Sequence, residues 1–207
     1  MKNQIVGVRT VAGEAAKDAI LKFKCMLVSQ IRYFLPENTL QYKEDRSMAI
    51  CHYLSKEKYG NLDGNYIYSR GNDLMDLNMI DCIWAMIDML EPENEGDMPL
   101  SVALKQAFTL ERPESLCFIR KNSQIIRAMA VETESDVHLI SFVQEKIMNL
   151  KNVKPGHENE IDDVLLIVIR NEDMLSKIST LDIKIPHKIA YLQGGMLEKP
   201  EVFYYGN

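Results

Sequence analysis

The sequence lacks several features that define common classes of protein. No run of apolar residues approaches the length of about 18 that a membrane-spanning helix needs, and the first residues show no signal-peptide pattern. We therefore expect a cytoplasmic protein with no membrane partner. The chain has four cysteines and a single tryptophan. Because no two cysteines form a CxxC pair, zinc and redox motifs are not indicated, and we expect reduced, buried thiols at Cys25, Cys51, Cys82 and Cys117.

Motifs for catalysis and cofactor binding are also missing. The chain contains no phosphate-binding glycine loop, no GxSxG elbow and no HExxH pair, and its four histidines are scattered. We therefore expect a protein that is not an enzyme, with no catalytic residues, no metal, no cofactor and no small-molecule substrate. One alternative stays open, a metal-dependent nuclease, because paired carboxylates can hold Mg²⁺. The candidate carboxylates are Glu132, Glu134, Asp162 and Asp163, although no lysine stands two residues after an acid on a convincing strand.

The composition is that of a globular chain, and its charge is unevenly distributed. The 207 residues are 46% hydrophobic and 26% charged, with a net charge of -6. Residues 1 to 70 contain 11 Lys and Arg against 7 Asp and Glu, so the remainder contains 13 against 23. This difference favours an N-terminal module that can approach phosphate, although ordinary variation among solvated faces explains it equally well.

The N-terminal residues show helical patterns followed by a hairpin pattern. Apolar residues at three- and four-residue spacing predict a helix over residues 15 to 35, and Asn38 or Thr39 can cap a short second helix. A third helix is predicted over residues 45 to 56. Two short strand-like runs then flank Asp63-Gly64, which predicts a type I′ turn.

This order of helix, short helix, helix and hairpin is typical of a winged helix-turn-helix. The third helix of such a unit enters the major groove of double-stranded DNA, and the hairpin lies near the phosphate backbone. We therefore predict DNA contacts from residues on the outer face of the third helix and just after it, namely Arg46, His52, Tyr53, Lys56 and Lys58. The acids Glu44, Asp45 and Glu57 would weaken such binding. The alternative is a winged helix that mediates dimerisation or docking to another protein, without DNA contact.

The rest of the chain predicts a connecting helix and a small sheet domain. A helix over residues 72 to 91, capped by Asn72 or Asp73, leads to an acidic loop that is the best candidate for a domain boundary. A second hairpin (115 to 131), a helix (135 to 150), an unbroken apolar strand (164 to 169), a short helix to about residue 179 and a strand (188 to 192) follow. We expect the tail, residues 202 to 207, to pack on its own chain rather than on a partner. The predicted fold class is α+β, divided into a winged helix (15–70), a connecting helix (72–91) and a small mixed α/β sheet domain (100–207).

The order of elements resembles a group of uncharacterised bacterial mobile-element proteins similar to the plasmid replication-relaxation family. The resemblance rests on residues 26–34, 46–68, 116–148 and 164–178, which are mostly apolar patterns without a chemical signature. It implies an N-terminal winged helix followed by a domain with the restriction-endonuclease-like fold that lacks catalytic residues. It also implies a DNA-associated accessory role in a plasmid or transposon, and it transfers no catalytic residue to this chain.

Overall fold

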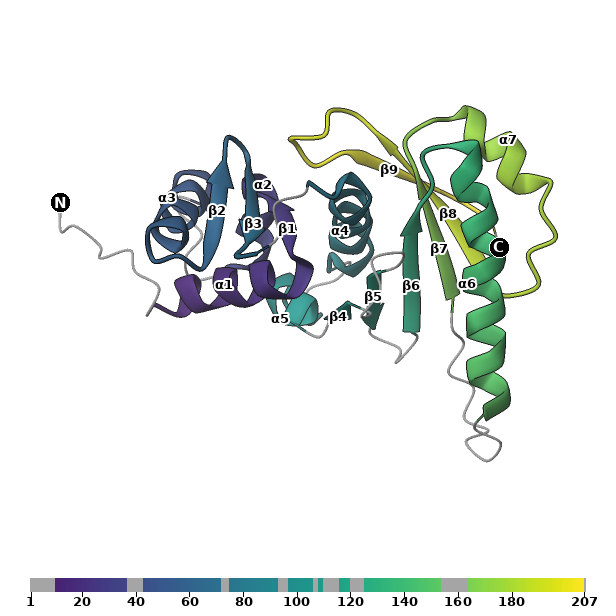
Figure 1. The fold of residues 1–207 in the computed structure, drawn as a ribbon, viewed down its shortest axis with the longest axis horizontal. Coiled ribbons are helices and arrows are strands. Elements are labelled where there is room, and N and C mark those ends of the chain that lie inside the picture. Colours follow the sequence, from purple (N-terminus) through teal and green to yellow (C-terminus); the bar gives the residue numbers. More distant parts are fainter. Residues whose placement is uncertain are drawn as a thin grey trace.

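The chain is a mixed α+β protein. The computed structural model describes residues 10–36, 43–71, 75–92, 97–105, 108–109, 116–119, 125–153 and 164–206. Within these residues the chain forms seven helices and two sheets (Figure 1), as the predicted α+β class requires. No helix in this part of the chain combines the length and the apolar character needed to cross a bilayer.

Three helices and a three-stranded sheet form what we call the N-terminal unit. Its elements in chain order are α1 (Val11–Phe23), β1 (Cys25–Leu27), α2 (Val28–Phe34), α3 (Lys43–Lys56), β2 (Gly60–Asp63) and β3 (Tyr66–Ser69). The strands are antiparallel and lie in the order β1-β3-β2. The three helices pack their apolar sides against this small sheet, which buries β1 and most of β3 and leaves much of β2 exposed.

The predicted helix over residues 15 to 35 is wrong in its extent, because two helices and a short strand occupy this segment. The side chain of Thr10 accepts a hydrogen bond from the Gly13 N–H and starts α1 earlier. Lys24, with φ 66°, then ends that helix and turns the chain into β1. The apolar spacing continues across the break because α1 and α2 face the same core. Asn38 and Thr39, the predicted caps of a second helix, lie outside the described residues.

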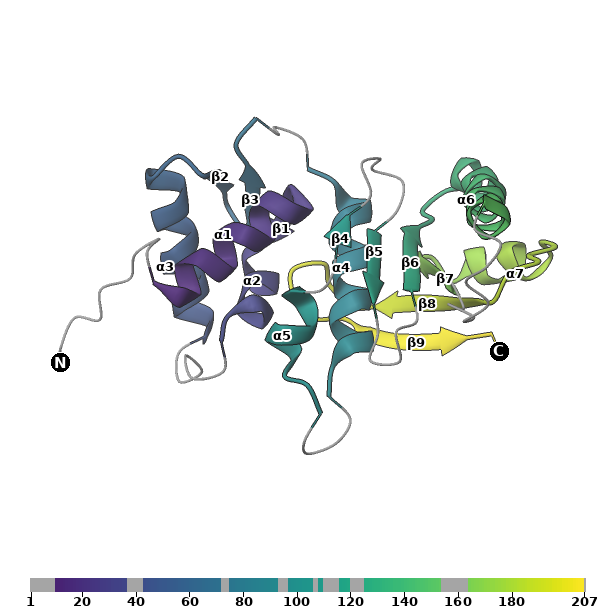
Figure 2. The ribbon, with the colours of Figure 1, turned by 90° about the horizontal axis from the view of Figure 1, so that it is seen from below.

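Helix α4 (Leu77–Leu90) lies between the N-terminal unit and the larger sheet (Figures 1 and 2). It begins later than predicted, because Asp76 rather than Asn72 or Asp73 caps it, by accepting a hydrogen bond from the Met79 N–H at 3.0 Å. Residues 80 to 87 are all buried, so the helix is covered on every side. It therefore joins the N-terminal unit and the larger sheet in one continuous core.

The larger sheet has six strands in chain order and is mixed, as predicted. Its strands are β4 (Phe108–Thr109), β5 (Leu116–Ile119), β6 (Ile125–Ala130), β7 (Val164–Ile169), β8 (His187–Gln193) and β9 (Glu201–Tyr205). Strands β6, β7 and β8 are parallel, and the remaining pairings are antiparallel. The short helix α5 (Leu100–Lys105) precedes this sheet. The tail forms β9 on its own chain, as we expected.

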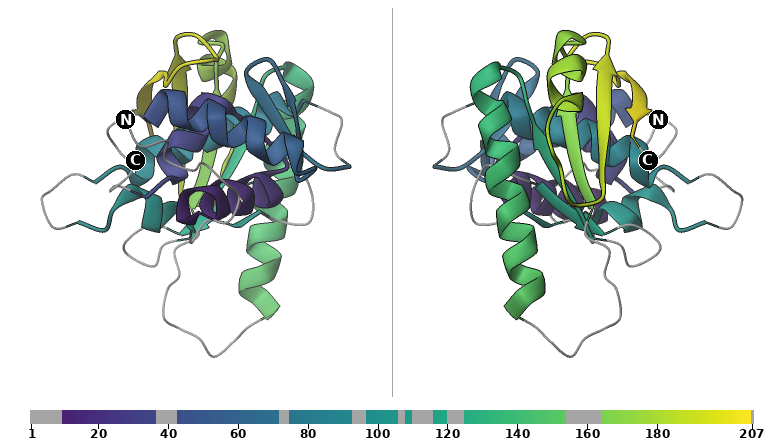
Figure 3. Two further views of the ribbon diagram at one scale, coloured as in Figure 1. Left: turned by 90° about the vertical axis from the view of Figure 1, so that its left-hand side faces the viewer. Right: turned by 90° about the vertical axis from the view of Figure 1, so that its right-hand side faces the viewer.

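Helices cover both faces of this sheet. Helix α4 packs on one face, whereas the crossover helices α6 (Glu134–Val153) and α7 (Asp173–Ser179) pack on the other (Figures 1 and 3). All six residues of the central strand β7 are buried, which explains its unbroken apolar sequence. The division of the chain into three parts at residues 70, 91 and 100 stays a prediction.

Candidate nucleic-acid interface

Helix α3 has one buried side and one exposed side. Ser47, Ile50, Cys51 and Leu54 are buried against the rest of the N-terminal unit, at the three- and four-residue spacing of a helix face. The opposite side carries an exposed stripe made of Ala49, His52, Tyr53 and Lys56. This stripe is the surface of α3 that can meet another molecule.

Three of the five predicted contact residues lie on this exposed stripe. His52 and Lys56 are exposed, and 38% of Tyr53 is accessible. Arg46 is half-buried at the border of the stripe, one helical repeat before Tyr53. Sequence reasoning did not name Ala49, which has no polar group. Its spacing of three and four residues before His52 and Tyr53 is the signal that would have found it.

Lys58 lies just beyond α3 in a left-handed backbone conformation. Its φ is 62°, its N–H donates to the Ser55 carbonyl at 3.1 Å, and the next N–H, of Tyr59, donates to the Leu54 carbonyl at 2.9 Å. These two bonds form a Schellman motif, which closes a helix and usually places glycine where Lys58 stands. The motif turns the chain sharply into β2 and leaves the Lys58 side chain exposed beside the end of α3.

The segment after α3 is tied to its neighbours at Tyr59. The Lys17 ammonium lies 4.6 Å from the centroid of the Tyr59 ring, and the Tyr59 carbonyl accepts the Arg70 N–H at 3.2 Å. These contacts hold the start of β2 against α1 and the end of β3. Arg70 follows directly after β3 and is exposed. The sequence analysis did not name it.

The hairpin β2–β3 is short, and its turn differs from the predicted one. Asp63 pairs with Tyr66, so Gly64 and Asn65 form the two-residue loop. Only Gly64 of that pair has a positive φ, at 56°, as in a type II′ turn rather than the predicted type I′ turn at Asp63-Gly64. The Asn65 carbonyl accepts the Val28 N–H at 2.9 Å, which fixes the turn to the start of α2.

The charges around this surface are mixed. Within the described residues, no carboxylate forms an ion pair with Arg46, Lys56 or Lys58. Glu57 and Asp63 are exposed in the same region, and the side chains of Glu44 and Asp45 lie outside the description. Arg46, Lys56 and Lys58 are therefore available to an anionic partner, and the neighbouring acids limit its affinity.

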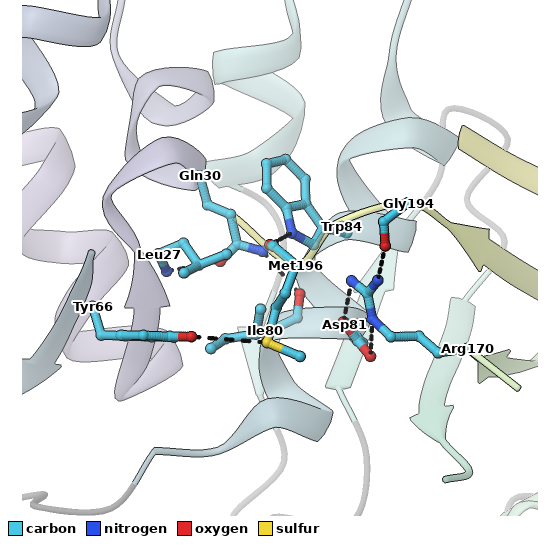
Figure 4. Close-up of polar contacts among 9 residues, drawn as sticks. All are labelled: Leu27, Gln30, Tyr66, Ile80, Asp81, Trp84, Arg170, Gly194 and Met196. Carbon is cyan, nitrogen blue, oxygen red and sulfur yellow. Dashed lines mark hydrogen bonds and ion pairs between the residues drawn. The ribbon is translucent and has the colours of Figure 1, made fainter. Parts of the chain in front are cut away.

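Asp81 of α4 forms an ion pair with Arg170, the residue that follows β7 (Figure 4). The Arg170 Nε lies 2.8 Å from both carboxylate oxygens of Asp81, and its Nη1 donates to the Gly194 carbonyl at 3.1 Å. Burial raises the pKa of the Asp81 carboxyl although Arg170 favours its charged form. The pair joins α4, the end of β7 and the loop after β8, which indicates a structural role.

The loop of residues 194–200 connects β8 to β9 and contacts the N-terminal unit (Figure 4). The Met196 carbonyl accepts the Trp84 indole N–H at 3.2 Å. The Leu197 carbonyl accepts the Ser29 hydroxyl at 2.6 Å. The Tyr66 hydroxyl lies 3.9 Å from the Met196 sulfur. These contacts fasten the sheet to α2 and β3, and they account for the single tryptophan without a ligand.

The carboxylates considered for a nuclease do not form a metal site in the described residues. Glu134 pairs with Lys177, which lowers the pKa of Glu134. Glu132 follows β6, and partial burial together with nearby Asp81 raises its pKa. In the part of the chain that the structure describes, no three histidine, cysteine or acidic side chains are grouped as metal ligands require. Asp162 and Asp163 lie outside that part.

Comparisons with other proteins add no assignment to these observations. No family model, no curated protein and no solved structure matches the chain.

Proposed function

We propose that the protein binds double-stranded DNA through α3 and the β2–β3 hairpin, as a DNA-associated protein that is not an enzyme. The observation that carries this proposal is the exposed stripe of α3, where polar and cationic side chains follow the small Ala49. A small residue at the start of the stripe lets the helix approach a groove closely there, while His52 and Lys56 can reach base edges or phosphates.

The proposal treats the N-terminal unit as a winged helix-turn-helix. The chain order α1-β1-α2-α3-β2-β3 and the antiparallel sheet order β1-β3-β2 support this assignment. In such a unit α3 is the recognition helix, and Lys58 and Arg70 flank the hairpin where phosphates pass. We further propose, from the resemblance in element order alone, that the sheet domain is endonuclease-like without activity and that the protein serves a plasmid or transposon.

Fluorescence anisotropy with a labelled duplex tests the proposal. If Arg46, Lys56 and Lys58 each neutralise a phosphate, affinity falls about 40-fold between about 50 and 200 mM salt, because bound cations release counterions. Lys56→Ala should weaken binding and reduce the slope of log affinity against log salt by about 0.9. The matched control is Lys184→Ala, which removes an exposed lysine from the segment before β8 and should change neither quantity.

The same measurement can overturn the proposal. Absence of binding at about 50 mM salt excludes phosphate contacts of this kind. Binding that Lys184→Ala weakens as much as Lys56→Ala would place the DNA on another surface.

A further inference from the structure

Strand β9 is an edge of the six-stranded sheet. Among the described strands it pairs with β8 alone. In an antiparallel strand, alternate residues direct their backbone N–H and C=O groups away from the neighbour, so the outer side of β9 offers donors and acceptors to a further strand. Such an edge pairs with another chain unless the sequence prevents it.

Apart from one charged residue at its start, the sequence of β9 contains none of the usual devices against pairing. Proteins protect edge strands with charged side chains, above all lysine, with proline, with a bulge or with a very short strand. Residues 201 to 205 contain no Lys and no Pro, and their register with β8 runs from Gln193↔Glu201 to Ile189↔Tyr205 without a bulge. Their only charged side chain is Glu201.

Aromatic side chains add apolar surface to this open edge. Phe203 is 40% exposed and Tyr205 is 41% exposed, and the two lie on the same face of the strand. The Phe203 ring packs against Tyr191 of β8, with 6.3 Å between ring centroids. Helix α6 lies toward the side of the sheet away from β9, which forms the opposite side (Figure 3, right). These aromatic groups are therefore accessible to a partner strand.

The edge is also held in place. Tyr204, on the other face, donates its hydroxyl proton to Asp88 of α4 at 2.9 Å, and Lys199 pairs with Glu91 at 2.5 Å and Asp88 at 3.6 Å. A strand that is already ordered loses little conformational freedom when a partner pairs with it. Strand β9 is therefore already ordered before a partner strand of similar length pairs with it.

We propose that this partner is a second copy of the chain, paired antiparallel through β9 about a two-fold axis at Phe203. A second copy fits this edge because the strand is compatible with itself: antiparallel pairing about Phe203 places each Glu201 opposite an uncharged Tyr205, so no like charges face each other. Parallel pairing would set the two Glu201 side chains side by side. Phe203 meets its own counterpart, and the two sheets become one. This interface is on the six-stranded sheet, whereas the proposed DNA surface is on the N-terminal unit, so dimerisation does not depend on DNA binding.

Sedimentation velocity and light scattering of the full chain test the proposal. We expect a mass of twice 23.8 kDa for the unmodified protein at micromolar concentration. Phe203→Lys should return the mass to that of one chain, because a charge at the axis opposes its own copy. Phe142→Lys is the matched control, since Phe142 is 41% exposed on α6, and it should leave the dimer intact.

Two outcomes overturn the proposal. One is a single-chain mass for the unmodified protein up to about 100 micromolar, a concentration that detects pairs of moderate affinity. The other is a dimer that Phe203→Lys leaves intact, which would place the interface elsewhere.

A second variant covers the case in which Phe203→Lys does not fold. Opposed residues of an antiparallel pair have Cα atoms about 5 Å apart, which a disulfide spans. Phe203→Cys should therefore form an intermolecular disulfide on mild oxidation, and Phe142→Cys should not. Absence of that disulfide in folded Phe203→Cys overturns the proposal as well.

Discussion

Single residues carry strain and burial that a residue type alone does not reveal. Lys58 has a left-handed backbone at a position where helix ends favour glycine. For a residue with a Cβ atom, this conformation costs about 1 kcal/mol. The lysine lies beside the proposed DNA surface, so the strain at this position and a phosphate contact can be tested separately.

Replacing Lys58 separates these two effects. Lys58→Gly should raise the free energy of unfolding by about 0.5 to 1 kcal/mol, since glycine adopts the left-handed conformation without strain. Lys58→Ala, which keeps the strain and removes the charge, should leave stability nearly unchanged. Both variants should weaken DNA binding equally. Chemical denaturation and anisotropy check the two expectations, and equal stability of the glycine and alanine variants would contradict the first.

Cys51 shows how burial controls a titration. The thiol is buried in α3, and burial raises its pKa to about 12 from an ordinary value of 9.0. The folded protein therefore retains the proton at pH values where the unfolded chain has lost it. Stability from this group is fully present below pH 9 and is lost as the pH rises toward 12.

The expected change is measurable between pH 8 and 10. Over that interval the free energy of unfolding should fall by roughly 1 kcal/mol on account of Cys51. Cys51→Ala leaves a cavity, whose cost does not depend on pH, and should remove this part of the pH dependence. Denaturation curves at several pH values compare the two slopes. Parallel slopes would mean that the Cys51 thiol titrates alike in both states.

At the scale of elements, the β2–β3 hairpin depends on one glycine at its base. A Cβ atom added to Gly60 would lie 2.6 Å from the Tyr68 carbonyl oxygen, so only glycine fits between the strands there. Gly60→Ala should therefore lower the free energy of unfolding by about 2 kcal/mol, the usual cost of forcing an extra carbon into a packed site. Chemical denaturation measures this loss, and amide exchange should become faster in β2 and β3.

The chain offers a matched control for this substitution. A Cβ atom at Gly195 would meet nothing within 4 Å, and Gly195→Ala should change stability by less than about 0.5 kcal/mol. Similar losses for both variants would indicate that the backbone at Gly60 can shift at little cost.

Elements with a strong pattern were predictable, because one physical cause produces both the pattern and the structure. The apolar run of β7 follows from helices on both faces of the sheet, and the spacing in α3 follows from a single buried side. Boundaries were less predictable. Asp73 and Asp76 are equally good caps in sequence, and the structure shows the Asp76 side chain accepting the Met79 N–H. The break at Lys24 has no sequence signal, because the positive φ occurs at a residue that is not glycine.

The candidate site was predictable in part for the same reason. The exposure of His52 and Lys56 follows from helical periodicity once Ile50 and Leu54 are assigned to the core. The role suggested for Ala49 depends on its small side chain and not on a polar group, so reasoning from polar residues did not identify it. The open edge of β9 depends on sheet order, which strand patterns alone do not specify.

For the whole molecule, the uneven charge lies along the long axis and is consistent with the proposed DNA surface at one end. Residues 1 to 70 carry a formal charge of +4 and residues 71 to 207 one of -10, from the counts of basic and acidic residues in each part. Helix α3 lies at one end of the long axis, and α6 and α7 lie at the other (Figure 1). Such a distribution orients the molecule as it approaches a polyanion, with the N-terminal unit leading.

A dimer through β9 would carry two N-terminal units and so bind DNA with both. On a duplex of about 40 base pairs, the second unit binds at high effective concentration once the first is bound. The unmodified protein should then bind that duplex at least tenfold more tightly than Phe203→Lys does. On a duplex of about 12 base pairs, which accommodates one unit, the two proteins should have equal affinity.

Phe142→Lys adds the same charge and should behave like the unmodified protein on both duplexes. Anisotropy at one salt concentration makes the comparison. If the dimer forms but duplex length does not separate Phe203→Lys from Phe142→Lys, the two N-terminal units do not reach one DNA molecule together, and each copy binds DNA on its own.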